Sequence, residues 1–408
     1  MLKRKGVERP QPMKPSGWKH VDALYGEWEL PQILYEMMQT RFMERLRGIS
    51  MGVMPYTDYD WVTLPNRCIH GLGVARLMAD VIEANPTLEE DAPTFLATEF
   101  AHDGGSIPCS HGPEPFLWDG HQHNCESLLP VMIDYFSPLL DPRSMKKVLT
   151  RNQILIERIM DGVLGRTALG RIIHGDIDLD NMDNLARFWC AAYPLRPLPF
   201  DPRELARSFV WNGKEWRLLG SAWSHIRGWR QARLEIYNRI QELPHFAVNA
   251  MFQRAIYFAH REKELTMENF YTKNDLDGIA HLGDNCNEKS RLLVRLVRSW
   301  DWYVEIVKFE FEATVPILLQ PYLERTLGPY ELADEIACHA GLAPMQVCVS
   351  LFRGNDRREI SLSFTDGTPI KNHLPVHREH YFLKVFAPRG LSEISKQKIR
   401  EAISTYIA

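Results

Sequence analysis

The sequence lacks several features that would place it in a specialised class of protein. It has no excess of positive charge, because 48 Lys and Arg residues stand against 52 Asp and Glu and give a formal net charge of −4. This balance argues against a general nucleic-acid-binding surface. No stretch approaches the ~18 consecutive apolar residues of a membrane-spanning helix. The basic residues 1–5 are followed by polar, proline-containing sequence instead of the apolar core of a secretion signal.

Cysteine is sparse, and its spacing shows no pattern. The seven cysteines are odd in number and form no Cys-x-x-Cys motif, which favours reduced thiols over a disulfide framework. We also find no internal repeats and no low-complexity segments. These absences predict a soluble, cytoplasmic protein.

The chain of 408 residues has the composition of an ordinary globular protein, and its sequence patterns divide it into three parts. Residues 1–25 are basic, contain proline and show no periodicity, so we expect a flexible N-terminal arm. Residues 26–335 carry long helical patterns and are predicted to form a helical core. Residues 336–408 mix strand and helix patterns and are predicted to form a small α/β C-terminal module. The predicted fold class is therefore mostly α.

Strand patterns are confined to two regions. Residues 209–218 predict a short β-hairpin, because Asn-Gly fits a type I′ turn between strand-forming residues. Helical patterns then resume from 221 to about 327. In the C-terminal module the predicted strands are 346–352, 359–364 and 381–386, and an amphipathic helix is predicted over 392–407. These strands contain no cluster of ligand-type side chains, so the module is expected to act as a scaffold or subunit contact.

The chemistry is concentrated in the stretch from Thr98 to Ser110. Here His102 and Asp103 are adjacent, end an apolar helical segment and are followed by two glycines. Neighbouring side chains on a helix diverge by about 100°, so the two can share a target where the helix is ending. An imidazole and a carboxylate that converge in this way suit a borderline divalent cation.

Two further helix starts supply similar side chains. His70 precedes a stripe of apolar residues at helical spacing, and Asp180 opens another amphipathic helix. Together His70, His102, Asp103 and Asp180 form a mixed nitrogen and oxygen set. Such a set suits Mn, Fe, Co or Zn, with Mg possible, and leaves coordination positions for water and phosphate. Asp178 remains an alternative to Asp180 because several aspartates lie close together.

The order of these motifs resembles that of HD-domain phosphohydrolases, and within them the dNTP triphosphohydrolases, meaning bacterial dGTPases and the sterile-alpha-motif/HD enzyme of animals. The resemblance covers about residues 38–237. The matching motifs, in order, are Glu44-Arg45-Leu46-Arg47, Asn66-Arg67-x-x-His70-x-Leu72-Gly73, His102-Asp103, Pro108-x-Ser110-His111, His123-x-x-x-Ser127, Ile177-Asp178-x-Asp180 and Ala186-Arg187. The resemblance implies an HD-domain helical core, selects Asp180 as the fourth ligand, and implies a homo-oligomer.

The same resemblance assigns roles to residues around the metal. Arg67 matches an arginine that binds phosphate, His111 a histidine that contacts the phosphates, and His123 the general acid. His121 lies two residues from His123, but the match to Ser127 favours His123. For the nucleoside, Tyr237 matches a tyrosine that stacks on or beside it.

Several positions depart from the family pattern. Ser106 stands where the family carries a histidine near the phosphates, and Asn124 replaces the glutamate that orients the acid. Asn184 and Phe188 fall where a tyrosine and an aspartate read the sugar, and Met51 falls near a glutamine that contacts the 3′-hydroxyl. We therefore expect a complete metal centre with altered sugar recognition, with Asn184 still placed beside the substrate.

The resulting hypothesis is a metal-dependent phosphohydrolase that splits (deoxy)nucleoside triphosphates into nucleoside and triphosphate. One alternative is an HD nucleotidase or phosphodiesterase that acts on another phosphate ester. A second alternative is a non-catalytic nucleotide-sensing or assembly protein that keeps the metal as a structural element. The expected partners are a nucleotide and further copies of the chain, with neither a membrane nor nucleic acid indicated.

Overall fold

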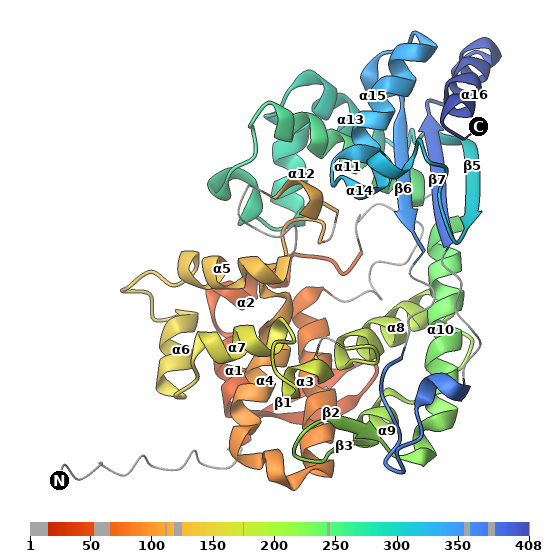
Figure 1. Ribbon diagram of the computed structural model, residues 1–408. Coiled ribbons are helices and arrows are strands. Elements are labelled where there is room, and N and C mark those ends of the chain that lie inside the picture. Colours follow the sequence, from red (N-terminus) through yellow and green to blue (C-terminus); the bar gives the residue numbers. More distant parts are fainter. Residues whose placement is uncertain are drawn as a thin grey trace, which may run out of the picture.

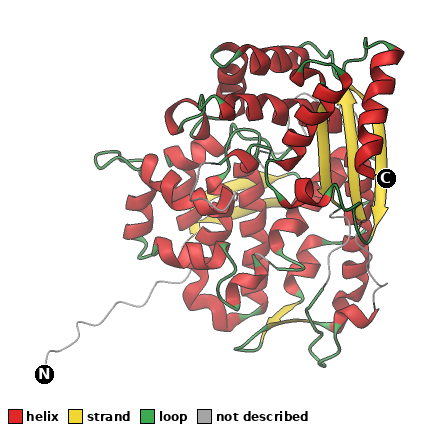
Figure 2. Ribbon diagram, turned by 45° about the horizontal axis from the view of Figure 1, so that its top comes forward, coloured by secondary structure: helices red, strands yellow, loops and turns green. Residues whose placement is uncertain are grey.

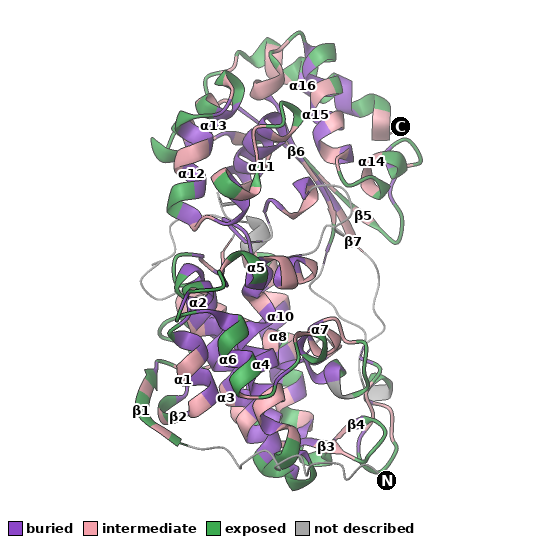
Figure 3. Cartoon of the chain, turned by 90° about the vertical axis from the view of Figure 1, so that its left-hand side faces the viewer, coloured by how far each residue is buried: buried purple, intermediate pink, exposed green. Residues whose placement is uncertain are grey.

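The computed structural model describes residues 15–52, 66–110, 112–117, 125–173, 175–242, 245–354, 360–373 and 380–407. The fold is mostly α-helical with small antiparallel sheets, as predicted. Two lobes are visible (Figure 1): a lower lobe that contains α1–α9 and an upper lobe that contains α11–α16 and a three-stranded sheet. Both lobes have a buried interior and an exposed surface (Figure 3). Among the described residues, no helix is long and apolar enough to cross a membrane.

Three helices form the centre of the lower lobe: α3 (Arg67–Ala84), α4 (Ala92–Ala101) and α8 (Leu179–Ala192). Local signals fix where two of them begin, because the side chains of Asn66 and Asp178 cap α3 and α8. Small residues let the helices approach closely, since a Cβ atom at Gly71 would lie 2.8 Å from the carbonyl oxygen of Phe100. The surrounding helices are α1 (Gln32–Met38), α2 (Arg41–Leu46), α5 (Leu129–Tyr135), α6 (Met145–Arg151), α7 (Ile156–Val163) and α9 (Pro202–Arg207).

The prediction of a flexible N-terminal arm over residues 1–25 is wrong for residues 15–25, which form part of a β-hairpin. Strand β1 (Pro15–Asp22) pairs with β2 (Gly26–Pro31) in an antiparallel hairpin. Asp22 and Tyr25 at its turn are buried, and Asp22 forms a 2.8 Å salt bridge with Arg187 of α8. The hairpin is held by this long-range contact, for which the sequence around residue 22 carries no periodic signal. Residues 1–14 lie outside the described part of the chain.

The second hairpin, β3 (Phe209–Trp211) and β4 (Trp216–Leu218), confirms the prediction for residues 209–218. Its turn is longer than the predicted two-residue type I′ turn, because Trp211 pairs directly with Trp216. The side chain of Asn212 accepts hydrogen bonds from the backbone N–H groups of Lys214 and Glu215, which stabilises a four-residue loop.

The upper lobe packs helices against an antiparallel sheet of order β5-β7-β6, with strands β5 (Val304–Glu312), β7 (His380–Ala387) and β6 (Cys348–Arg353). Strand β5 corrects the expectation of helix up to about residue 327, since its apolar side chains alternate with Glu and Lys at the period of a strand. Its helices are α11 (His245–Arg261), α12 (Asp275–Asp284), α13 (Glu288–Arg298), α14 (Gln320–Glu324), α15 (Gly328–Ala340) and α16 (Glu393–Ile407). The long helix α10 (Trp223–Glu242) runs along one side of the molecule toward this sheet (Figure 1).

The predicted boundary at residue 336 does not match the packing. Val315 and Leu319, which precede it, already belong to the apolar cluster beneath the sheet. Residues 360–373, which we call the crossover segment, leave that cluster, because Ile360 and Ile370 belong to the larger apolar cluster that contains the core of α3, α4 and α8.

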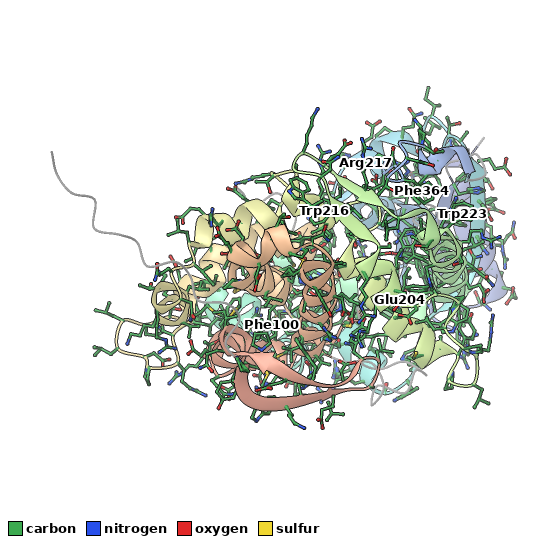
Figure 4. The ribbon with its side chains drawn as sticks, turned by 90° about the horizontal axis from the view of Figure 1, so that it is seen from below. Phe100, Glu204, Trp216, Arg217, Trp223 and Phe364 are labelled. Carbon is green, nitrogen blue, oxygen red and sulfur yellow. The ribbon has the colours of Figure 1, made fainter. Side chains whose placement is uncertain are left out.

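The crossover segment also corrects the strand predicted over residues 359–364. Of that range, 360–364 add no strand to the upper sheet, and residue 359 lies outside the described residues. Instead, the backbone N–H of Leu218 donates to Ser363 O (3.1 Å), and Thr365 N–H donates to Leu218 O (2.9 Å). The ring centres of Phe364 and Trp223 lie 6.4 Å apart, and both residues gather at the same corner of the molecule (Figure 4).

Candidate metal centre

Three helix ends bring the four predicted metal ligands together. His70 lies in the first turn of α3, His102 and Asp103 at the end of α4, and Asp180 in the first turn of α8. One ligand atom each of His70, His102 and Asp180 lies within 4.8 Å of the others. Asp103 Oδ2 lies 3.5 Å from His70 Nε2 and 3.4 Å from His102 Nε2. All four side chains therefore point at one small volume.

The two imidazoles are oriented so that their Nε2 atoms face this volume. His102 Nδ1 bonds the backbone oxygen of Glu99 (2.6 Å), and His70 Nδ1 bonds Asp183 Oδ2 (2.6 Å). His70 Nε2 lies 2.9 Å from Asp180 Oδ1. The Nε2 atom of His102 is buried and makes no hydrogen bond with any described residue. It lies 3.4 Å from Asp103 Oδ2 and 3.6 Å from Asp180 Oδ1 instead. Two imidazole nitrogens and two carboxylates around one small volume form a donor set that fits a divalent transition metal.

The charges of the centre support the same interpretation. Burial lowers the pKa of His102, but Asp103 and Asp180 outweigh it and hold this pKa well above its ordinary value. Burial raises the pKa of Asp180, but the two histidines bring it well below the ordinary range. The cluster thus favours positive charge beside its carboxylates. A divalent cation would supply that charge.

Arg67, the predicted phosphate-binding residue, is buried beside the ligands. Its Nη1 atom donates to Asp103 Oδ2 (2.7 Å), and its Nε atom donates to Ser110 Oγ (3.0 Å). The guanidinium group is therefore fixed at the edge of the cluster. Among the ligands, the side chain of Asp180 is the most open to solvent, at 38% exposed. A phosphate group entering from that side would meet the arginine and the ligands together.

Two supporting residues have roles that the sequence did not reveal. Asp183 is fully buried and accepts hydrogen bonds from His70 Nδ1, from Arg187 Nε (2.7 Å) and from the Tyr25 hydroxyl (2.8 Å). It fixes the ring of His70 as carboxylates commonly do for metal-binding histidines. The sequence signal that could have indicated this role is the spacing of three residues between Asp180 and Asp183, which puts both carboxylates on one face of α8.

Arg45 explains the Glu44–Arg47 motif. Its guanidinium group donates to the backbone oxygens of Gly104 (2.9 Å) and Ser106 (2.7 Å), just after the two ligands on α4. Burial lowers the pKa of Arg45 to about 10. The arginine therefore holds the turn that places His102 and Asp103.

The sequence also did not indicate Glu99 as a residue of the site, because this glutamate lies in an apolar helical segment. It is fully buried, and neither carboxylate oxygen accepts a hydrogen bond from a described residue. Burial raises the pKa of Glu99 well above its ordinary value. A buried carboxyl group whose neutral form is favoured by burial thus lies one helical turn before the predicted ligands.

Several of the remaining predicted site residues are not among the described residues. His111 and His123 lie outside the described residues, as do His121 and Asn124. Asp178, the alternative ligand, caps α8 by accepting from Asn181 N–H (2.7 Å), so Asp180 is the residue that reaches the histidines.

The predicted substrate contacts lie on α8 and α10. Asn184 and Phe188 follow Asp180 at one and two helical turns and are half-buried. Tyr237 packs against the guanidinium group of Arg233, 4.6 Å from its ring centre, and Arg233 donates to Asn181 Oδ1 of α8 (2.9 Å).

The two other departures from the family pattern are buried. Met51 is 4% exposed. Ser106 lies 3.5 Å, Oγ to Oδ1, from Asp103. A serine therefore stands directly beside a ligand, where the family resemblance implied a histidine.

A separate cavity of about 470 Å³ lies between the lower lobe and the crossover segment, away from the metal ligands. Asp176 in its wall accepts hydrogen bonds from Ser361 N–H (2.6 Å) and from the Ser361 hydroxyl. Figure 4 shows Trp216 and Arg217 of the same wall near Phe364. Its other lining residues are Leu164, Gly165, Ala168, Arg171, Gly175, Lys214, Glu215, Leu362 and Ser363.

Comparison with known proteins identifies the fold without a function. No family model matches the chain. An uncharacterized protein from Methanocaldococcus jannaschii is 22% identical over 265 residues, which is 64% of this chain and 54% of that protein. The chain thus spans about half the length of this relative. The crystal structure of a hypothetical protein from Aquifex aeolicus has a TM-score of 0.70 and 16% identity, and the match covers 94% of this chain and 99% of that one. The fold is shared.

Proposed function

We propose that the chain is a metal-dependent phosphohydrolase of the HD type, acting on (deoxy)nucleoside triphosphates and releasing nucleoside and triphosphate. One observation carries the proposal: His70, His102, Asp103 and Asp180 converge at three helix ends, with the guanidinium group of Arg67 bonded to one of them. Structural ion pairs also bring such residues together, but here the buried Nε2 atom of His102 makes no hydrogen bond of good geometry to a described residue.

The proposed ligands would hold one divalent ion of Mn, Fe, Co or Zn, with Mg possible. Such an ion, when bound, lowers the pKa of a coordinated water and withdraws charge from a phosphoryl oxygen. Asp183 and the backbone oxygen of Glu99 keep the two imidazoles in the orientation that exposes Nε2. These supports give the centre its geometry before any ligand enters.

Arg67 supplies the phosphate contact in this proposal. Its planar guanidinium group suits two-point binding of phosphate oxygens, and its bonds to Asp103 and Ser110 orient it before substrate arrives. His111 and His123 stay predictions for the phosphate contact and the general acid. The departures at Ser106 and Phe188 favour a second candidate, namely an HD phosphohydrolase that acts on a different phosphate ester.

Turnover of a nucleotide panel tests the proposal. NTPs, dNTPs, NMPs and cyclic dinucleotides would each be incubated with chain loaded with Mn, Fe, Co, Zn or Mg, and the phosphate products separated. We expect inorganic triphosphate and nucleoside in equal amounts, and loss of both products in the Arg67→Ala variant. Release of monophosphate would select the second candidate. Stoichiometric nucleotide binding without turnover under every metal would contradict an enzymatic function and leave a sensing or assembly role.

A further inference from the structure

One carboxylate of the upper lobe connects to the metal centre through a chain of hydrogen bonds. Asp275 is the first residue of α12 and is 6% exposed. Its Oδ1 atom accepts from the backbone N–H of Cys109 (2.6 Å). Its Oδ2 atom accepts from the N–H (2.8 Å) and the hydroxyl (2.7 Å) of Ser50. The carboxylate thus joins two segments of the lower lobe that are distant in sequence.

These two segments meet at Ser110. The hydroxyl of Ser110 donates to the backbone oxygen of Ser50 (2.6 Å) and accepts from Arg67 Nε (3.0 Å). Cys109, the other partner of Asp275, is the residue directly before Ser110. Both supports of this serine therefore lead back to the carboxylate of Asp275.

The chain of hydrogen bonds that starts at Asp275 ends at Arg67, the proposed phosphate-binding residue, and at Asp103, a proposed metal ligand. Arg67 Nη1 donates to Asp103 Oδ2 (2.7 Å), while the backbone N–H of Arg67 donates to Ile49 O (2.8 Å), next to Ser50. Both the side chain and the backbone of Arg67 are thus held by the segments that Asp275 joins. An arginine fixed in this way loses little conformational freedom when it binds phosphate.

The backbone that Asp275 contacts is in a strained conformation. Cys109 and Ser110 have φ angles of 63° and 55°, in the left-handed region that non-glycine residues rarely adopt. Each costs roughly 1–2 kcal/mol relative to ordinary backbone. Such conformations persist where surrounding bonds determine them, and they concentrate at functional sites. Helix α12 also packs tightly on this loop, since a Cβ atom at Gly278 would lie 2.6 Å from Pro108 Cβ.

We propose that Asp275 is a positioning residue: through Ser50, Cys109 and Ser110 it fixes Arg67 for contact with the phosphate groups of the substrate. This inference rests on the proposed function, because it assumes that Arg67 binds phosphate. It makes α12 of the upper lobe part of a site whose ligands all come from the lower lobe.

Binding of inorganic tripolyphosphate tests the inference without turnover. The full chain would be loaded with Mn²⁺, freed of unbound metal, and titrated calorimetrically with tripolyphosphate. We expect Asp275→Asn and Ser110→Ala each to raise the Kd by about tenfold or more, which corresponds to ~1.4 kcal/mol. Asp277→Asn is the matched control, because it removes an exposed carboxylate from the same turn of α12 and should change the Kd less than about twofold. Metal content should be equal in all variants.

A double-mutant cycle separates positioning from a merely structural role. In an Arg67→Ala background, Asp275→Asn should raise the Kd no further, because the residue through which it acts is gone. An additive loss in that background would show that Asp275 supports the fold rather than Arg67. Should Asp275→Asn fail to fold, Ser50→Ala takes its place, since it deletes a hydroxyl that donates to Asp275 and leaves both Arg67 and α12 unaltered; an unchanged Kd in this variant overturns the inference.

The outcomes distinguish this inference from the proposed function. Tripolyphosphate binding by the unaltered chain with an unchanged Kd in Asp275→Asn and Ser110→Ala overturns the inference and leaves the function standing. A tighter Kd in Asp275→Asn also overturns it, because the negative charge rather than the hydrogen bonds would then govern Arg67. Absence of tripolyphosphate binding by the unaltered, metal-loaded chain overturns the phosphate site itself, and the inference with it.

Discussion

At the scale of single residues, His102 is the most informative side chain. Its Nδ1 atom is fixed by the helix that carries it, while its Nε2 atom is buried without a hydrogen bond to any described residue. In the metal-free chain this nitrogen lies 3.4 Å from Asp103 Oδ2 and 3.6 Å from Asp180 Oδ1, so a charged ring stabilises the two carboxylates. We propose that a bound metal takes over this role.

We therefore predict that His102→Ala retains the fold but loses the metal. The melting temperature of the metal-free chain should fall, because Asp103 and Asp180 lose the charge of the ring, but the chain should still fold, since Arg67 and His70 remain paired with these carboxylates. Elemental analysis of the purified variant should find less than about a tenth of the metal of the unaltered chain. His339→Ala, an exposed histidine on α15, is the control and should keep full occupancy. Full occupancy in His102→Ala would refute the assignment of this ligand.

The pH dependence of stability should differ with and without metal. The pKa of His102 is raised in the folded, metal-free chain, so its contribution is complete below the unfolded value of ~6.5 and is lost as pH rises through the folded pKa. The melting temperature of the chelator-treated chain should thus fall as pH rises above about 6.5.

Metal affinity should change in the opposite direction over the same range. The imidazoles bind metal only when neutral, so affinity should rise with pH. Melting curves at several pH values, with and without chelator, measure both effects. A metal-free chain that gains stability above pH ~6.5 would contradict the electrostatics described for this cluster.

The residues proposed to lie beside the sugar predict that it is recognised weakly. Phe188 is half-buried on α8 and offers packing but no hydrogen bond, and Met51 is buried and apolar. A pocket without polar partners discriminates close analogues by roughly 10 to 100-fold. Any triphosphohydrolase activity should therefore accept 2′,3′-dideoxy substrates within about tenfold of the deoxy forms, judged by kcat/KM for dGTP and dATP. A preference above about a thousandfold would show that other residues read the 3′-hydroxyl.

At the scale of elements, α8 does more than deliver one ligand. Asp180 faces the metal cluster, while Asp183, one turn later, holds His70 and the N-terminal hairpin through Tyr25. Arg187, a further turn on, pairs with both Asp183 and Asp22. One face of this helix thus couples the candidate metal centre to the β1–β2 hairpin.

Asp183→Asn should weaken both metal binding and the fold. Loss of a carboxylate behind a metal-binding histidine typically lowers metal affinity about 10 to 100-fold. It also leaves the buried Arg187 with one carboxylate fewer, for which ~3–5 kcal/mol is the usual cost of breaking a buried pair. Metal titration and urea unfolding measure the two effects. Tyr25→Phe, which removes only the hydroxyl bonded to Asp183, should cost about 1 kcal/mol and leave metal affinity near that of the unaltered chain. Equal affinity in Asp183→Asn would mean that His70 needs no support.

At the scale of the whole molecule, the chain passes between its lobes more than once. It leaves the lower lobe along α10, builds the upper sheet, returns as the crossover segment and enters the sheet again as β7. Figure 2 shows the sheet bordered by helices at one end of the molecule. The crossover segment therefore ties the predicted C-terminal module to β4 and to the large apolar cluster.

Phe364→Ala tests this connection. Phe364 is 6% exposed, packs against Trp223, and lies where the crossover segment pairs with β4. Replacing a buried phenylalanine with alanine costs ~3–5 kcal/mol, and we expect a loss in this range by urea unfolding. Metal content should stay unchanged, because the ring touches none of the ligands. Ile394→Ala, at an exposed apolar position on α16, is the control and should cost less than about 0.5 kcal/mol. A negligible loss in Phe364→Ala would show that the crossover segment only rests on the surface.

The sequence by itself determined where the candidate ligands stand. His70, His102, Asp103 and Asp180 lie at helix starts and ends, and those boundaries are encoded locally by capping side chains, glycines and apolar periodicity. The mostly helical fold class and the β3–β4 hairpin followed from the same short-range signals.

Only the tertiary structure decided what supports those ligands. Asp183 meets Tyr25, Asp275 meets Cys109, and the crossover segment meets β4, in each case across a long stretch of chain. A buried carboxylate takes its partners from whatever donors the fold brings near it, and no local pattern of residues specifies them. Strand β5 and the hairpin at residues 15–31 were likewise decided by the tertiary structure, because a strand is stabilised by its partner strand and by the helix or core that it covers.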